Sequence, residues 1–357
     1  MRKSLVLLPV LLVVAALLVA SAPAEAGRRR VALGIWNPER ASAIDVFDEF
    51  TQSMGGVKPA IWNVASVWGR PDNQAFPAVI AAQAKARGAT LMVTWSPVKP
   101  PLATETGFYS QYKNIAAGRH DRYIRSWARQ AKRFNRPILL RFAHEFNAAF
   151  FPWSVKWGKF YDPDTGERTT KNTNSPFQFR RAWIRIVKIF RGVRANKVKF
   201  VWTPAQETCQ GCNPYKKWYP GNKWVDYVGY STFNWGNFRQ AGAFRNFEET
   251  IVQPMGKFKE FTRKPVIIAE VGTTHEDAPS GELDKPEWII NGYNAVYRKY
   301  PQVKAIVYQD VDFTGESHGH PNWGLAFSPT WSAIEAYRRV AAQPRFKGKV
   351  NWRGQIR

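Results

Sequence analysis

Two glutamates that follow short apolar runs are the residues of this chain best suited to acid–base chemistry. Glu145 lies in the segment Arg-Phe-Ala-His-Glu-Phe-Asn of residues 141–147, and Phe-Pro-Trp at residues 151–153 comes shortly after it. Glu270 ends a second apolar run and is followed by Val-Gly. If both runs are buried strands, each delivers a carboxyl group to the rim of a sheet. Cleavage of a glycosidic bond needs such a pair, with one carboxyl group as acid/base and the other as nucleophile or base.

Short apolar or β-branched runs recur along the chain and alternate with helical patterns. The expected strands are 31–36, 58–63, 90–95, 138–143, 198–203, 227–231, 266–269 and 305–308. Apolar side chains at helical spacing predict helices over 120–134 and 177–191. Strands that alternate with helices indicate parallel βα units, and about eight such units predict an α/β protein built as a single (β/α)8 TIM barrel.

This fold would bring the two glutamates to one place. Barrel enzymes carry their chemistry at the carboxyl ends of the strands. Glu145 would follow the fourth strand and Glu270 the seventh, so the two carboxyl groups could face each other across a bound sugar. Strand alternation would point Arg141 to the same side as Ala143 and Glu145, where its guanidinium could hold Glu270 ionised.

The first 26 residues have the pattern of a secretory signal peptide. A basic start precedes an apolar stretch over residues 5–20, and Ala24-Glu25-Ala26 is a small-x-small cleavage site. The apolar stretch is short for a membrane anchor, and no later stretch is long enough to cross a bilayer. We therefore expect a secreted, extracellular protein with a catalytic domain over 27–342 and a basic C-terminal tail over 343–357.

The chain is strongly basic, with a net charge of +25, and removal of the signal peptide would leave +24 because it carries two basic residues and one acidic residue. Such a balance predicts anionic surroundings, such as acidic polysaccharide, a wall polymer of the teichoic type, lipid headgroups or nucleic acid. No zinc-finger, RNP-type or helix-turn-helix signature is present, so we expect no nucleic-acid partner. The charge predicts either adhesion to an acidic wall or matrix polymer, or plain solubility.

Two pairs of residues could hold a metal or form a bridge. Cys209 and Cys212 are the only cysteines, and in an oxidising compartment we expect them to form a disulfide that tightens one loop. A redox pair and half of a zinc site are the alternatives. His318 and His320 hint at a metal, but no ligand pattern partners them, and lining the cleft is the other interpretation. We expect no metal and no cofactor.

A set of motifs, in their order and spacing, resembles glycoside hydrolase family 26, the retaining β-mannanases and related β-glucanases and β-xylanases. The likeness covers most of the chain after the signal peptide. The motifs are residues 144–147 with 151–153, 219–222 with 226–229, 233–236, 269–272 and 322–323.

The resemblance implies a retaining double displacement in which Glu145 matches the acid/base and Glu270 matches the nucleophile. Retaining chemistry needs carboxyl groups about 5–5.5 Å apart, whereas an inverting pair needs about 6.5–9.5 Å. For the aromatic candidates core packing is the alternative to sugar stacking, and His144 could instead orient a carboxylate. The candidates for substrate binding are His144, Asn147, Arg141, Phe150, Trp153, Phe233, Trp235 and Trp323.

Departures from the family pattern concern the sugar pocket. Phe233 stands where the family usually carries a tyrosine beside its nucleophile, and a phenyl ring cannot donate a hydrogen bond to Glu270. Phe150 replaces a tryptophan and Ala148 a glycine. Thr-Trp-Ser-Pro at residues 94–97 stands where mannan-cleaving members place a histidine. The catalytic pair is kept while the pocket is altered, so the identity of the glycan stays open.

We therefore expect a secreted retaining endo-β-glycosidase that hydrolyses a β-linked polysaccharide of the mannan or glucan type. One alternative is a polysaccharide- or cell-wall-binding protein on the same barrel with weakened or lost activity, which Phe233 favours. Another is a basic matrix protein that binds anionic polymer through charge alone. Binding of that last kind would collapse with added salt, because screening limits its reach to about 8 Å at physiological ionic strength.

Overall fold

The computed structural model describes residues 29–38, 40, 44–68, 76–99, 108–109, 111–148, 151–155, 160–161, 168–169, 174–206, 214–236, 245–274, 285–314, 322–325 and 331–357. Outside these ranges lie the expected signal peptide over 1–26 and the residues Phe150, Cys209, Cys212, His318 and His320.

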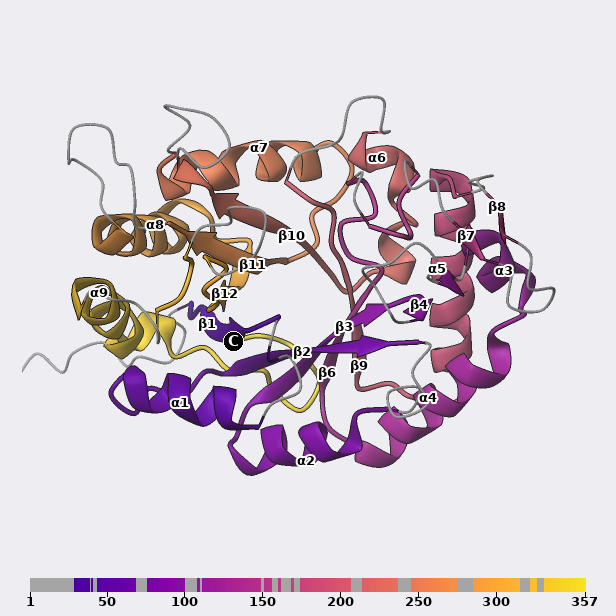
Figure 1. The fold of residues 1–357 in the computed structure, drawn as a ribbon, viewed down its shortest axis with the longest axis horizontal. Coiled ribbons are helices and arrows are strands. Elements are labelled where there is room, and N and C mark those ends of the chain that lie inside the picture. The colour runs from indigo at the N-terminus through magenta and orange to yellow at the C-terminus, as the bar shows by residue number, and fades with distance from the viewer. Residues whose placement is uncertain are drawn as a thin grey trace, which may run out of the picture.

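Parallel strands form a closed barrel in the order β1-β12-β11-β10-β9-β6-β3-β2, which confirms the TIM-barrel prediction (Figure 1). All eight predicted strands are present, and the second begins at residue 61 rather than at residue 58. The strands are β1 (Ala32–Trp36), β2 (Ile61–Val67), β3 (Thr90–Ser96), β6 (Ile138–Phe142), β9 (Val198–Trp202), β10 (Tyr227–Asn234), β11 (Val266–Thr273) and β12 (Val303–Gln309).

Helices surround this barrel (Figure 1). They are α1 (Asp45–Ser53), α2 (Ala78–Ala86), α3 (Tyr112–Ala117), α4 (Asp121–Phe134), α5 (Pro176–Gly192), α6 (Tyr215–Trp218), α7 (Phe247–Lys259), α8 (Lys285–Lys299) and α9 (Trp331–Ala342), with 3-10 turns η1 (Asn222–Trp224) and η4 (Pro344–Phe346). Short ribbons pair β4 (Val98–Lys99) with β5 (Phe108–Tyr109), and β7 (Phe160–Tyr161) with β8 (Arg168–Thr169). The helices predicted over 120–134 and 177–191 are confirmed as α4 and α5. Among the described helices, none has the length and apolar character needed to span a membrane.

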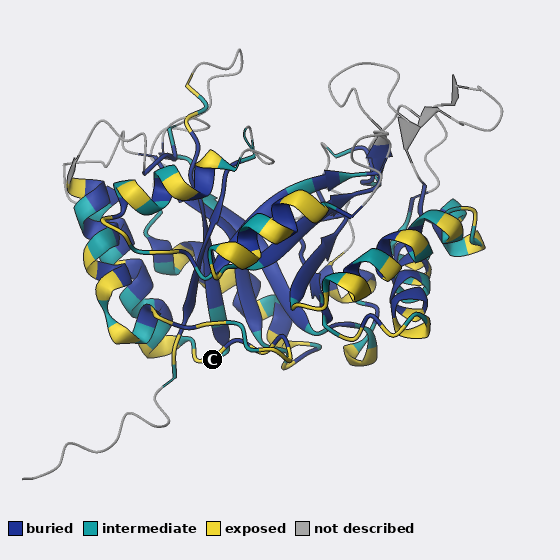
Figure 2. Cartoon of the chain, turned by 90° about the horizontal axis from the view of Figure 1, so that it is seen from below, coloured by how far each residue is buried: buried dark blue, intermediate teal, exposed yellow. Residues whose placement is uncertain are grey.

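The strands are buried on both faces, as Figure 2 shows. Ile138, Leu140 and Phe142 of β6 belong to the large cluster between barrel and helices, while Leu139 belongs to a smaller separate cluster that fills the barrel. This alternation follows from the two-residue period of a strand. The same alternation predicts whether a side chain near the carboxyl end of a strand points into the barrel or toward the helices.

The C-terminal segment over 343–357 packs against the end of the barrel where the strands begin. The backbone N–H of Gly348 donates to the carbonyl of Val31, just before β1, at 3.1 Å. The hydroxyl of Tyr227 donates to the Gly354 carbonyl at 2.8 Å and accepts from the N–H of Ile356 at 3.2 Å. Ile356 is buried with the cluster inside the barrel. The segment expected as a tail is therefore part of the barrel floor.

Candidate active site

Arg141 of β6 crosses the barrel and binds Glu270 of β11. Its side chain is fully buried, and Nη1 forms an ion pair with Oε1 of Glu270, so the contact expected from the sequence is present. Nη2 donates to Oγ of Ser231 in β10 at 2.6 Å, and that hydroxyl donates to Oε2 of Glu270 at 2.8 Å. Nη1 also approaches Oγ1 of Thr94 in β3 at 3.4 Å. Both oxygens of the Glu270 carboxylate are thus held by donors from other strands.

A β-bulge turns Glu270 into the barrel. Tyr230 of β10 pairs with Ile268 of β11, but the next residue, Ser231, pairs with Glu270, so β11 contains one extra residue at this step. The pairing of β11 with β12 shifts at the same place. Ile268 faces the helices, and strict alternation would point Glu270 the same way. The bulge reverses that direction, which is a common use of bulges next to active sites.

Glu145 lies in a tight turn directly after β6. Ala143 and Glu145 have positive φ angles of 46° and 52°, a conformation that costs energy for residues with a side chain. Their N–H groups donate to the carbonyls of Trp95 at 3.0 Å and Thr203 at 2.8 Å, so neighbouring strands hold the turn from both sides. Glu145 is buried, with 7% of its surface exposed. The alternation expected to continue to Glu145 stops at Phe142, and this turn sets its direction instead.

His144 is buried among aromatic rings beside the turn. Its ring lies 4.6 Å from Phe151 and 5.3 Å from Trp153, centre to centre, and the indole N–H of Trp153 donates to the His144 carbonyl at 2.7 Å. Burial, and to a smaller degree the charge of Arg141, hold the pKa of His144 well below its ordinary value of 6.5. Among the described residues its Nδ1 has no hydrogen-bond partner. The imidazole is therefore neutral, and its Nδ1 is shielded from solvent.

Trp153 and Asn147 support the turn. Trp153 is 2% exposed and stacks on Phe151 with centroids 4.5 Å apart, so its ring is packed as core. The amide of Asn147 binds the backbone of Ala205 after β9, accepting from its N–H at 2.8 Å and donating to its carbonyl at 3.3 Å. These contacts place both residues behind Glu145 as structural supports.

Three aromatic rings form a wall beside Glu270. Phe233 stacks on Trp323 with centroids 4.3 Å apart, and Trp235 meets Trp323 edge-on at 4.8 Å. A Cβ at Gly272 would lie 3.0 Å from Cγ of Trp323, so the indole packs against the β11 backbone just beyond Glu270. Trp323 is buried, while Phe233 and Trp235 are partly exposed. The two partly exposed rings are thus the ones available to a sugar.

Sequence reasoning missed two supports of this site. Ser231 was not among the candidate residues, and strand register brings it opposite Glu270. Lys285 of α8 is fully buried, and its Nζ donates to the Gly324 carbonyl at 2.7 Å, next to Trp323. Neither contact leaves a local signal in the sequence, because each partner is distant along the chain.

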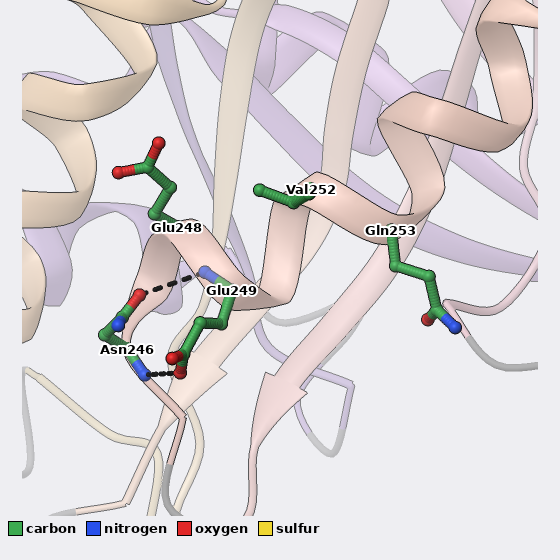
Figure 3. Close-up of a pocket in the computed structure, with 5 residues that line it drawn as sticks. All are labelled: Asn246, Glu248, Glu249, Val252 and Gln253. Carbon is green, nitrogen blue, oxygen red and sulfur yellow. Dashed lines mark hydrogen bonds between the residues drawn. The ribbon is translucent and has the colours of Figure 1, made fainter.

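A separate hollow of about 620 Å³ lies at the start of α7 (Figure 3). Three of its polar side chains already have partners: Asn246 and Glu249 bind each other in a capping box, and Glu248 pairs with Lys299 at 2.7 Å. The hollow contains neither candidate catalytic glutamate. It is lined by Asn246, Glu248, Glu249, Val252 and Gln253. In the described part of the chain, no cluster of three or more His, Cys, Asp or Glu side chains is arranged to hold a metal ion.

Comparisons with known proteins match this chain in sequence and in fold. The sequence model of glycosyl hydrolase family 26 matches residues 93–303. Endoglucanase H of Acetivibrio thermocellus is 28% identical over 254 residues, which are 71% of this chain, and the chain spans only 24% of that protein.

Solved structures share the fold. A modular endo-β-1,4-mannanase from Cellulomonas fimi superposes with a TM-score of 0.59 at 18% identity, covering 89% of this chain and 71% of that one. A family 26 β-mannanase from Bacteroides ovatus gives a TM-score of 0.54 at 17% identity, covering 89% and 90%. The family resemblance expected from the sequence motifs is confirmed.

Proposed function

Because the chain belongs to glycosyl hydrolase family 26, we propose that it is an O-glycosyl hydrolase with Glu270 as nucleophile and Glu145 as acid/base. The observation that carries this proposal is the fixed carboxylate of Glu270. An ion pair with Arg141 and a hydrogen bond from Ser231 hold it inside the barrel. Glu145 lies in the turn directly after β6, toward the carboxyl ends of the strands. A nucleophile must be held in one orientation if it is to attack a single carbon atom.

The proposed reaction has two displacements. An oxygen of Glu270 attacks the anomeric carbon while Glu145 gives its proton to the glycosidic oxygen, and the leaving sugar departs as an alcohol. Glu145, now a carboxylate, then takes a proton from water, and the resulting hydroxide oxygen attacks the same carbon and releases Glu270. Each oxygen of a carboxylate can accept from a donor and still offer a lone pair, so Arg141 and Ser231 can remain bound during the attack.

We further propose that the substrate is a β-linked polysaccharide of the mannan or glucan type, cut within the chain. The names of Endoglucanase H and of the similar β-mannanases support this class of substrate. Phe233 and Trp235 offer partly exposed rings for the apolar face of a sugar. The signal-peptide pattern over 1–26 supports secretion to the cell exterior, and the net charge of +25 supports adhesion to an anionic wall or matrix polymer.

The test of the catalytic pair is single substitution of each glutamate. We expect Glu145→Gln and Glu270→Gln each to reduce the release of reducing ends at least about 10²-fold, the lower range for loss of a general acid or base. Glu287→Gln, on the exposed surface of α8, is the matched control and should leave the rate unchanged. A panel of neutral and charged polysaccharides identifies the substrate, and NMR of the first product should show retention. Unchanged hydrolysis in both catalytic variants would overturn the assignment.

A binding protein with weak or lost turnover is the second candidate. It is favoured by Phe233, which stacks on Trp323 and offers no hydroxyl to Glu270. The hydroxyl of Ser231 provides a donor to the carboxylate instead, which favours activity. Binding of a glycan with no product after long incubation would establish this second candidate.

A further inference from the structure

The helices α4 and α5 together carry a local excess of positive charge. The sequence of α4 contains five basic residues and the single acid Asp121, and α5 contains five basic residues and no acid. By contrast, α7 carries two glutamates and two lysines. Asp121 is already bound by Arg185 of α5 at 2.7 Å. Ten of the 52 basic residues therefore lie on these two neighbouring helices.

A hollow of about 420 Å³ lies between the ends of these two helices. Arg125, Arg129 and Lys132 line it from α4, and the spacing of four and three residues places them on one helical face. Residues 192–194, at the C-terminal end of α5, also line it. Among the described residues that line the hollow, none is acidic. An anion entering it would meet Arg129, Lys132 and Arg194, while Arg125 is paired with Asp121 at 3.8 Å.

Arg194 closes α5 in a conformation that disfavours arginine. Its φ angle is 61°, and its N–H donates to the Arg191 carbonyl at 2.9 Å, as in a left-handed helix cap. Glycine or asparagine fits such a cap at lower cost. An arginine here places a guanidinium at the rim of the hollow in spite of that cost.

A second group of cations lies near the same end of α5. Arg191, Lys223 and Lys188 surround the ring of Trp224, with their charged groups 5.0, 5.2 and 5.9 Å from its centroid. Cation–π attraction offsets part of the repulsion between them. Arg191 also donates to the Lys223 carbonyl at 2.6 Å. We name the hollow and this group together the basic track, which consists of Arg125, Arg129, Lys132, Lys188, Arg191, Arg194 and Lys223.

The basic track lies away from the candidate active site. The C-terminal ends of α4 and α5 lead into β6 at Ile138 and β9 at Val198, so they lie where the strands begin. Glu145 and Glu270 lie toward the opposite ends of the strands. Figure 1 shows α4 and α5 side by side on the outside of the barrel. A polymer held on the track would leave the mouth open.

We propose that the basic track binds a linear anionic wall or matrix polymer through its repeated carboxylate or phosphate groups. This inference rests on the proposed adhesion to an anionic wall or matrix polymer and assigns that adhesion to a defined surface. Guanidinium groups bind carboxylate and phosphate oxygens through paired hydrogen bonds. Each exposed ion pair is weak, so a row of cations favours a repeating ligand over a small anion. The cations cover the ring of Trp224, so the track offers a nucleic-acid base no free stacking surface.

The test compares two triple variants of equal charge. The track variant is Arg129→Gln/Lys132→Gln/Arg194→Asn. The control variant carries the changes Arg298→Gln/Arg339→Gln/Lys347→Gln at three exposed positions elsewhere. The probes are polygalacturonate for carboxylate, poly(glycerol phosphate) for phosphate, neutral galactomannan, and duplex DNA. Affinity is measured by calorimetry at low and at physiological ionic strength.

We expect the unmodified protein to bind polygalacturonate, poly(glycerol phosphate) or both. The probe that binds more tightly shows whether the track prefers carboxylate or phosphate groups. The track variant should bind roughly tenfold more weakly, as expected for three exposed ion pairs, and the control variant should change by less than about twofold. Equal loss in both variants would overturn the localisation alone. If the unmodified protein binds neither polyanion, the proposed adhesion to an anionic polymer is wrong as well. If duplex DNA binds more tightly and depends on the same residues, the ligand of the track is nucleic acid instead. Hydrolysis of the neutral glycan reports separately on Glu145 and Glu270 and should be unchanged in the track variant.

Discussion

Replacement of Arg141 by methionine tests the buried ion pair that orients the nucleophile. The Arg141 side chain is fully buried and that of Glu270 is 6% exposed, so Arg141→Met leaves a buried carboxylate with Ser231 as its remaining described donor. Removal of one partner of a buried ion pair costs about 3–5 kcal/mol, because the other charge stays desolvated. We expect the free energy of unfolding to fall by about that amount.

The companion variants isolate the interaction from the loss of packing. Glu270→Met leaves the guanidinium unpaired and should also destabilise the barrel. The double variant Arg141→Met/Glu270→Met removes both charges, and replacement of a buried pair by apolar side chains is often neutral or even stabilising. We therefore expect the double variant to be more stable than either single variant.

Urea unfolding followed by tryptophan fluorescence measures all three changes, since the chain has 16 tryptophans. Arg339→Met, at an exposed position of α9, is the control and should stay within about 0.5 kcal/mol of the unmodified protein. If the two single effects add in the double variant, the side chains do not interact, and the orientation assigned to Glu270 is wrong.

Three further predictions concern the surroundings of the site and the barrel floor. Burial lowers the pKa of His144 in the folded state, so the stability that it contributes is present above pH 6.5 and lost as pH falls below it; urea titrations of His144→Gln should show a weaker acid dependence. Gly272→Ala should displace Trp323 and lower kcat/KM roughly tenfold, the effect of a small misplacement, while Gly256→Ala, with open space around its Cβ, should not; equal rates in the two variants would count against the aromatic wall. Tyr227→Phe should lose its hydrogen bonds to the C-terminal segment at a cost of about 1–3 kcal/mol, and limited proteolysis should then remove residues 348–357 faster; unchanged protection would contradict the packing of this segment.

The architecture could be predicted because its signals are local. The run at 138–143 and the pattern at 177–191 show their periods within a few residues, and the structure places β6 and α5 there. The periods arise from the geometry of one strand or one helix, so no distant contact is needed to detect them. The same holds for His144-Glu145 and for Glu270, because their motifs are contiguous.

The directions of the functional side chains depend on pairing between strands that are far apart in sequence. Arg141 meets Glu270 across 129 positions, and the bulge before Glu270 exists only relative to the register of β10 and β12. The turn at Glu145 is held by carbonyls of two other strands.

The eight-strand barrel, the helices over 120–134 and 177–191 and the two candidate glutamates follow from local patterns in the sequence. The inward direction of Glu270, its bond from Ser231 and the packing of α4 beside α5 depend instead on contacts between distant parts of the chain. The physical reason is that a repeating pattern depends on neighbours along the chain, whereas register, bulges and surface charge depend on which strands and helices meet when the barrel closes.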